Sequence, residues 1–436
     1  MNLQERLAQI EAAAAQPGGL ALRSVARLTD GQPDLLRALE AAAVPHWWDE
    51  STLAFVLDQD LALDASGWAT QLRELPVTEP FLAVPGAFNI HEVTRLALRD
   101  KLHAEGRLPD LSARALRAVS QSSETVTSDR TIEQLYHQLL AEPEAGAEAL
   151  ETAWRDLDNQ GRWATLLDLA AMLEEVLPHL TAPARTRALL RRATIRSDRS
   201  GSSEIKVQAA ESLFLFQQLG NERAQSQALN LLGDLATAQG NLPEAQRLFG
   251  ESLRIRQRLS ESDPANAEWQ RDLSVSLNKL GDLATAQGNL PEAQRLFGES
   301  LRIAQRLAES DPANAAWQRD LSVSLNKLGD LATAQGNLPE AQRLFGESLR
   351  IAQRLAESDP ANAAWQRDLS YSYTIIGQLL MQQKRWAEAL PLLEQSLAID
   401  ERLAASDQSN VMWQQDVAVS RRLVTQVRAR VKSLDP

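Results

Sequence analysis

Residues able to catalyse a reaction or bind a metal are few in this chain, and they form no known motif. The 436 residues include five histidines and no cysteine. His91 and Glu92 are followed by Arg95 where an H-E-x-x-H zinc site would place its second histidine. No Gly-Lys dipeptide is present to build a phosphate-binding loop, and no G-x-S-x-G sequence is present to position a nucleophilic serine. We therefore expect no enzyme activity, no metal site and no cofactor.

The composition is that of a folded protein with an acidic surface. Hydrophobic residues make up 44% of the chain and charged residues 24%, which is outside the range of disordered sequences. The net charge of -13 disfavours nucleic acid as a partner and favours basic or amide-rich ones. Glu5 and Arg6 lie where a signal peptide would need apolar residues, and no run of about 18 apolar residues occurs. These features predict a cytoplasmic protein that does not bind membranes.

A repeat of 48 residues dominates the second half of the chain. Residues 273–320 and 321–368 are identical, residues 225–272 differ from them at seven positions, and residues 369–416 retain the pattern in degenerate form. Such self-similarity is typical of solenoids, in which each unit packs mainly against its neighbours.

Each unit contains the pattern of two amphipathic helices. The first, helix A, has apolar residues at three- and four-residue intervals and ends at Gly288. The second, helix B, begins after Asn289, whose spacing to Glu292 is that of a capping box, with Pro291 in the first turn. Asn314 then precedes the next helix A as a candidate cap. The unit is thus predicted to be a helical hairpin.

This unit resembles the tetratricopeptide repeat, whose pattern is W-x2-L-G-x2-Y, A-x3-F and P on a 34-residue period. The matching residues are Leu277, Leu280, Gly281, Ala284, Ala293 and Phe297. Leu277 replaces the tryptophan, Ala284 the tyrosine and Gln305 the terminal proline. The 14 additional residues correspond to roughly four helical turns, so each helix is expected to be about two turns longer than usual. The long-period repeats of the kinesin light chain type look similar.

The resemblance implies a binding surface on helix A. In family members the concave groove is lined by residues just before and just after the Leu-Gly pair. In this chain we call the residues at those positions the polar ladder. Its members are Asn230, Asp234, Asn278, Asp282, Asn326, Asp330, Thr374 and Gln378. The aspartates argue against a carboxylate ligand and favour a basic or amide-rich peptide or helix. The alternative is that the ladder is a solvated face without a ligand.

One tryptophan recurs in every unit, at Trp269, Trp317, Trp365 and Trp413. A row of exposed indoles would suggest a platform for stacking a ligand. Their place on the apolar stripe of helix A instead predicts a structural role in packing between adjacent repeats.

The N-terminal region differs in character. Residues 18–120 contain three predicted helices, a β-hairpin around Pro85 and Gly86, and a helix from Glu92 to Glu105. This order is similar to a winged helix, and the residues from Phe88 to Arg95 resemble the winged-helix segment of STAND-type signal-transducing ATPases. Only one basic residue, Arg73, lies on the third helix, so packing between domains is favoured over DNA binding.

The sequence therefore predicts an all-α protein with a right-handed helical-hairpin solenoid, preceded by a small winged-helix-like domain with one β-hairpin. The predicted regions are an N-terminal lead (1–17), the winged-helix-like domain (18–120), degenerate repeats (128–224), four tetratricopeptide-like repeats (225–416) and a capping helix (417–436). The predicted function is a non-catalytic scaffold that binds a partner protein in its groove. The alternative is a regulatory or sensor subunit, or a fragment, of a STAND-type signalling system that docks through the N-terminal domain.

Overall fold

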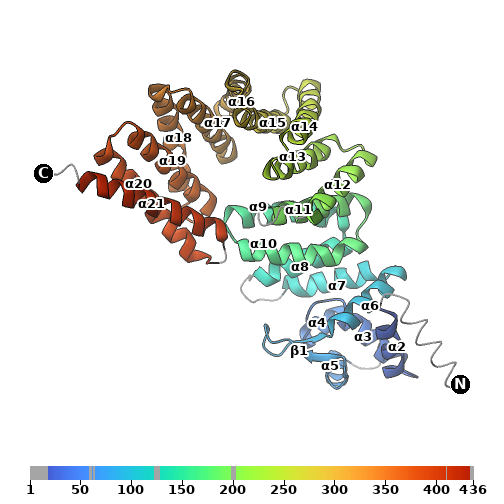
Figure 1. Ribbon diagram of the computed structural model, residues 1–436. Coiled ribbons are helices and arrows are strands. Elements are labelled where there is room, and N and C mark those ends of the chain that lie inside the picture. Colours follow the sequence, from blue (N-terminus) through green and yellow to red (C-terminus); the bar gives the residue numbers. More distant parts are fainter. Residues whose placement is uncertain are drawn as a thin grey trace. The chain divides into compact units, whose positions relative to one another are not determined.

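The computed structural model describes residues 18–57, 61, 64–121, 128–197, 203–408 and 410–432, which are almost entirely helical (Figure 1). The predicted lead, residues 1–17, lies outside the described residues, as do the last four residues of the predicted capping helix. The chain divides into two compact units. The first takes in the described residues up to Thr152 together with Ala171–Ala188, and the second takes in Ala153–Ala170 and everything from Leu189 onward.

Short helices and one hairpin build most of the first unit. Its elements are α2 (Gly19–Leu28), α3 (Pro33–Ala42), α4 (Glu50–Val56), α5 (Ala65–Arg73), β1 (Thr78–Pro80), β2 (Phe88–Ile90), α6 (Glu92–Ala104), α7 (Leu108–Gln121) and α8 (Ser128–Ala141). Three further helices have residues in both units: α9 (Pro143–Asn159), α10 (Trp163–Val176) and α11 (Ala182–Ser197). The short helix η1 (Leu177–His179) belongs to the first unit.

The predicted β-hairpin is confirmed. Strands β1 and β2 pair antiparallel, with Thr78 opposite Ile90 and Pro80 opposite Phe88. Trp48, in the segment before α4, adds an antiparallel bridge to Phe88, and their rings stack at 5.4 Å. The hairpin is therefore held to the helices by a buried aromatic contact, since Trp48 has no exposed surface.

A buried ion-pair cluster holds the core of the first unit together. Arg95 on α6 makes two hydrogen bonds to Glu175 on α10, at 2.7 and 3.1 Å, and Arg99 pairs with the same carboxylate. The Tyr136 hydroxyl on α8 donates to Glu175 at 3.1 Å, and Arg99 lies 4.7 Å from the centre of the Tyr136 ring. Arg99 and Tyr136 are completely buried. One carboxylate thus pairs with two guanidinium groups that burial has removed from water, and balances the charge of one of them.

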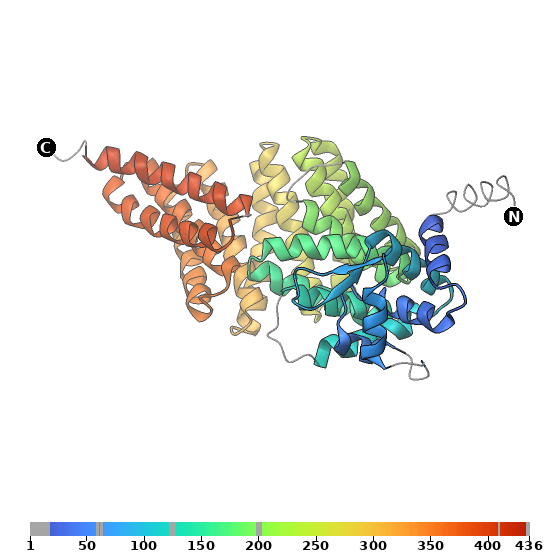
Figure 2. The ribbon, with the colours of Figure 1, turned by 90° about the horizontal axis from the view of Figure 1, so that it is seen from below.

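Ten helices of regular length form the repeat array of the second unit, in which successive helices run antiparallel and pack side by side (Figures 1 and 2). They are α12 (Ser203–Gln218), α13 (Glu222–Ala238), α14 (Leu242–Ser262), α15 (Ala267–Ala286), α16 (Leu290–Ser310), α17 (Ala315–Ala334), α18 (Leu338–Ser358), α19 (Ala363–Gln382), α20 (Trp386–Ser406) and α21 (Val411–Lys432). Helices A are α13, α15, α17 and α19, and helices B are α14, α16, α18 and α20. The hairpin prediction is confirmed, with helices of 20 and 21 residues in the identical units.

The predicted helix caps are present, but the capping box is only half formed. Asn289 accepts a hydrogen bond from the backbone N–H of Glu292, and Asn314 accepts one from that of Trp317 at 3.2 Å. The Glu292 carboxylate does not reach back to the Asn289 N–H, because that N–H already donates to the carbonyl of Ala284 at 2.8 Å. Glu292 pairs with Arg295 instead, at 2.7 Å.

A glycine sets the distance between helix A and helix B in every unit. A Cβ atom at Gly233, Gly281 or Gly329 would overlap the ring of the phenylalanine 16 residues later on helix B, and one at Gly377 would overlap Leu393. Those rings are buried; Phe297, for example, is 2% exposed. The Leu-Gly pair of the repeat pattern therefore reflects a close approach of two helices, with the aromatic ring filling the space that a side chain would occupy.

The four repeated tryptophans are buried to different degrees. Trp413, on α21, is 4% exposed and belongs to an apolar cluster with Ala363 of α19 and Leu403 of α20. Trp317 and Trp365 are partly buried and pack against the main core of the array, and Trp269 is partly buried as well. Truncating Trp413 should thus be more costly than truncating the other three.

Replacing Glu175 tests the buried ion-pair cluster. Glu175→Gln would leave two buried guanidinium groups without a counter-charge, and we expect it to reduce the free energy of unfolding by about 3–5 kcal/mol. Glu92→Gln, exposed in the first turn of α6, is the control and should change stability by less than about 1 kcal/mol. Urea unfolding followed by circular dichroism measures both, and equal stability of the two variants would contradict a role for the cluster.

Two glycines of one repeat should respond in opposite directions to alanine. Gly329→Ala would push Cβ into the Phe345 ring and is expected to destabilise the protein by about 1–3 kcal/mol. Gly346→Ala, on helix α18 with no atom within 4 Å of the new Cβ, should stabilise it by about 0.5–1 kcal/mol because alanine favours helices. Thermal unfolding distinguishes them; destabilisation by both substitutions would mean that close approach is not the reason for Gly329.

Candidate functional site

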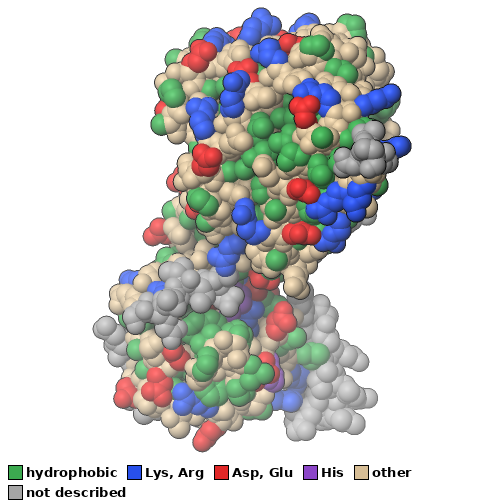
Figure 3. Space-filling view, turned by 90° about the vertical axis from the view of Figure 1, so that its left-hand side faces the viewer, with side chains coloured by type: hydrophobic (Ala, Val, Ile, Leu, Met, Phe, Trp, Pro, Cys, Tyr) green, Lys and Arg blue, Asp and Glu red, His purple; other side chains and the backbone are tan. Residues whose placement is uncertain are grey.

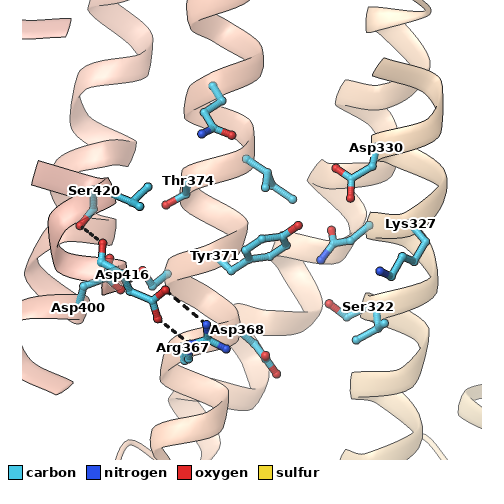
Figure 4. A pocket seen from close by; sticks show the side chains of 16 residues that line it. Ser322, Lys327, Asp330, Arg367, Asp368, Tyr371, Thr374, Asp400, Asp416 and Ser420 are labelled. Carbon is cyan, nitrogen blue, oxygen red and sulfur yellow. Dashed lines mark hydrogen bonds and ion pairs between the residues drawn. The ribbon is translucent and has the colours of Figure 1, made fainter. Parts of the chain in front are cut away.

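The candidate site is a pocket of about 580 Å³ near the C-terminal end of the repeat array, here called the C-terminal pocket. Residues of α17, α19, α20 and α21 line it (Figure 4). Four members of the polar ladder come together there, namely Asn326, Asp330, Thr374 and Gln378. Asn278 and Asp282 line a neighbouring pocket of about 230 Å³, and Asn230 and Asp234 line neither of the two.

Consecutive A helices are joined by a series of Arg–Asp ion pairs between residues 49 positions apart. Arg319 lies 2.5 Å from Asp368, and Arg367 lies 2.7 Å from Asp416. The other members of the series are Arg223–Asp272 and Arg271–Asp320. The series continues into α21, so the last helix is attached to the array as one more helix A.

A second series of ion pairs involves the aspartates of the polar ladder. The carboxylate of Asp234 lies 2.7 Å from Lys279 Nζ, and that of Asp282 lies 2.8 Å from Lys327 Nζ. In each pair the lysine comes from the next helix A, 45 residues later. Two of the three ladder aspartates are therefore already neutralised within the protein, and their lysine partners were not identified from the sequence.

Asp330 breaks this series, because the residue 45 positions later is Ile375. The described residues place no cation within 4 Å of the Asp330 carboxylate. Burial in the pocket raises its pKa to about 6; Lys327 opposes the shift and Asp282 adds to it. The side chain still has exposed surface, so it can reach a ligand. Asp330 is thus the ladder carboxylate whose charge is not balanced by an ion pair.

Tyr371 faces Asp330 across the C-terminal pocket. It occupies the position held by Val275 and Val323 in earlier units and is 48% exposed. Its ring extends from α19 toward Asp330 and Lys327 (Figure 4). Burial, with the nearby Asp330 and Asp282, raises the pKa of its hydroxyl to about 12, so the group is neutral at physiological pH. This aromatic residue was not predicted, although comparison of the degenerate unit with its neighbours would have revealed it.

A second carboxylate lies beneath the pocket. Asp400 on α20 replaces the alanines at 304 and 352, is 4% exposed and accepts a hydrogen bond from the Ser370 hydroxyl. Burial raises its pKa, and hydrogen bonds from Ser370 and Ser420 oppose the shift. Asp400 therefore places a buried carboxyl group, without an ion-pair partner among the described residues, at the same end of the array.

The asparagines of the ladder are largely buried. Asn230 is 7% exposed, and its amide group donates a hydrogen bond to the Ser252 hydroxyl and accepts hydrogen bonds from Arg256. The Asn326 side chain lines the C-terminal pocket and is 9% exposed, and its Oδ1 has no hydrogen-bond partner among the described residues. Thr374 bonds to Ser396 at 2.7 Å, whereas Gln378 is exposed. The ladder is thus partly structural and partly accessible.

The pocket offers oxygen acceptors, an aromatic side chain and two basic groups that are already in ion pairs. Within the described part of the chain no group of three His, Cys, Asp or Glu residues is placed to hold a metal ion. Among the described helices none is sufficiently long and apolar to span a bilayer. On the face drawn in Figure 3, basic and acidic side chains lie interspersed. The arrangement can bind a cation or a hydrogen-bond donor by its oxygens.

Tetratricopeptide repeat models match residues 224–287, 273–313, 321–361 and 369–408. The resemblance found in the sequence is thereby confirmed over residues 224–408. No curated protein matches the chain in sequence.

Several solved structures are similar to this chain. A STAND protein with a tetratricopeptide repeat sensor from Pyrococcus horikoshii is 13% identical, covering 95% of this chain and 63% of that one, with a TM-score of 0.48. This chain therefore spans less than two thirds of that protein. A putative kinesin light chain from Podosopora anserina with nearly identical repeats is 22% identical in sequence. The match covers 53% of this chain and 100% of that one, with a TM-score of 0.35. A Rap protein complexed with Competence and Sporulation Factor is 12% identical, covering 78% and 97%, at 0.42.

The raised pKa of Asp330 predicts that replacing this residue by an uncharged one stabilises the protein in a pH-dependent way. The folded state disfavours the charged form of this carboxylate, so ionisation of Asp330 lowers the free energy of unfolding. This destabilisation is absent below about pH 4, grows as pH rises, and is complete above about pH 6. Asp330→Asn should therefore match wild type near pH 4 and be more stable at pH 7.5, by less than about 1 kcal/mol because the group is partly exposed. Asp282→Asn, which removes the partner of Lys327, should show no such gain. Urea unfolding at both pH values measures the difference; a pH-independent effect would contradict the assignment.

Proposed function

With residues 224–408 built of tetratricopeptide repeats, we propose that this chain is a non-catalytic scaffold that binds a peptide or helix of a partner protein. The binding surface is the groove formed by the polar faces of helices A and α21, and the C-terminal pocket is its centre. The observation that carries this proposal is the meeting of four ladder residues with Tyr371 in one open pocket.

The chemistry of the pocket favours a basic or amide-rich partner segment. Asp330 and Asp400 have no ion-pair partner among the described residues, while Lys327 and Arg367 are paired with Asp282 and Asp416. Uncharged acceptors and donors, such as Gln378 and the Tyr371 hydroxyl, suit the amides of a peptide. The internal ion pairs at Asp234 and Asp282 favour the solvated-face interpretation for the earlier part of the ladder, so the proposal rests on its C-terminal part.

The N-terminal unit supports a second role, in docking. The order of α3, α4 and α5 before an antiparallel hairpin, with Trp48 bridged to the second strand, supports a winged-helix-like domain. Leu82, in the loop between β1 and β2, is 93% exposed. Single exposed leucines are common on protein surfaces, so Leu82 serves here as the residue whose replacement tests docking. Docking through this unit is the regulatory or sensor alternative.

A photo-crosslinking amino acid at Val323 tests the groove. Val323 is 37% exposed and lines both pockets of the groove, so a crosslinker there should capture a partner that binds between α15 and α19. The same amino acid at Arg302, exposed on helix B α16 and absent from the lining of the C-terminal pocket, is the matched control. Crosslinked products from the native extract are identified by mass spectrometry.

We expect one partner to be captured at Val323, not at Arg302, and to be lost when Asp330→Lys is added. Capture that survives Asp330→Lys but disappears with Leu82→Asp would favour docking through the N-terminal hairpin. Equal capture at both crosslinker positions would contradict a groove-specific site.

A further inference from the structure

The repeat itself defines where a cation is missing. In two successive pairs of A helices, the ladder aspartate of one helix holds the lysine ammonium of the next, as in Asp234–Lys279 and Asp282–Lys327. The third pair retains the aspartate, Asp330, but has Ile375 in place of the lysine. Helix α17 is joined to α19 through α18, as each earlier helix A is joined to the next through its helix B. The structure therefore contains the acceptor half of an ion pair whose donor half is not found among the described residues.

We propose that the partner supplies this missing cation, with the ammonium group of a partner lysine side chain pairing with Asp330 in the C-terminal pocket. The inference deepens the proposed function, on which it rests, by naming the group of the partner that is recognised. The two internal lysines serve as the structural precedent for a lysine rather than for a bulkier group.

A second acceptor lies beside Asp330 in the pocket. The Oδ1 atom of Asn326 is buried, has no hydrogen-bond partner among the described residues and belongs to a side chain that lines the pocket. Asn326 and Asp330 are four residues apart on α17 and therefore lie on the same face of the helix. In the preceding pair the Oδ1 atom of Asn278 has no hydrogen-bond partner among the described residues although Lys327 is held by Asp282, so the internal lysine does not bond that amide oxygen. A partner lysine would enter from the open pocket, and its ammonium has three N–H donors with which to reach both the amide oxygen and the carboxylate. A buried acceptor without a donor is costly, and a bound ammonium would remove that cost.

The rest of the pocket fits the remainder of a lysine side chain. Val323, Ile375 and Val419 line it with apolar surface, which suits the four methylene groups of lysine. The Tyr371 side chain extends toward Asp330 with its hydroxyl oxygen foremost (Figure 4), so that oxygen is a further acceptor for the bound ammonium. The nearby Lys327 does not compete, because its ammonium is already held by Asp282 at 2.8 Å.

The test restores the missing lysine within the chain. Ile375→Lys should place an ammonium at Asp330, as Lys279 and Lys327 do at the preceding positions, and so block the site. Ile375→Met, which has similar length but no charge, is the matched control. Asp330→Asn removes the acceptor with little change of shape at an exposed residue, so it tests the same pair if Ile375→Lys unfolds.

The probe is a phage-displayed library of random 12-residue peptides, selected on the full-length wild-type chain. A selected peptide is synthesised and each of its lysines is replaced in turn by norleucine, which retains the apolar stem without the charge. Fluorescence anisotropy measures Kd for every combination of peptide and protein variant.

We expect one norleucine replacement to weaken binding about tenfold or more, and Asp330→Asn to weaken the parent peptide by the same factor. The norleucine replacement and Asp330→Asn combined should weaken binding by no more than either change alone, which is the result expected when the two groups contact each other directly. Ile375→Lys should weaken binding at least tenfold, and Ile375→Met less than about threefold.

Two failures are distinguishable. A peptide that no longer binds the Val323→Arg variant is judged to bind in the groove. If such peptides are insensitive to both the norleucine replacements and Asp330→Asn, the lysine assignment is overturned and the proposed function is left intact. Failure to select any peptide that is sensitive to Val323→Arg would count against both.

Discussion

The close approach of helix A to helix B at a single glycine is the constraint on which the repeat array depends. At Gly281 the buried Phe297 ring occupies the space of the absent side chain, and the same contact recurs at Gly233 and Gly329. Because the hairpin is fixed in this way, the apolar faces of its helices are directed into the core. The polar face of each helix A is then available to contact the next helix A and to line the groove.

Ion pairs between A helices use most of the charge on that polar face. Where the following unit retains its lysine, the ladder aspartate pairs with it, as in Asp234–Lys279 and Asp282–Lys327, and each Arg–Asp pair is complete. The degenerate fourth unit replaces four groove residues of its helix A at once, introducing Tyr371, Thr374, Ile375 and Gln378. The unbalanced carboxylate, the exposed aromatic ring and the larger pocket therefore share one cause, which is departure from the repeat. Binding capacity arises where the pattern is broken.

Local features of this fold could be predicted from the sequence, and contacts between distant residues could not. Helical periodicity, the caps at Asn289 and Asn314, and the β-hairpin all depend on residues a few positions apart. The partner of the Glu292 carboxylate could not be predicted, because the Asn289 N–H had two possible acceptors. The lysines opposite Asp234 and Asp282 escaped prediction because periodicity within a helix says nothing of the register between neighbouring helices. The same reason applies to Glu175, which meets Arg95 from 80 positions away.

The walls of the C-terminal pocket come from residues 322–420, which contain only the last of the identical units. Gain or loss of one perfect copy upstream would therefore leave every one of those walls unchanged. Unequal recombination between identical stretches of coding sequence makes such changes easy. In this protein the number of identical repeats could change during evolution and alter only the length of the array. The residues that recognise a partner would stay the same, because they belong mostly to the one unit that no longer matches the others.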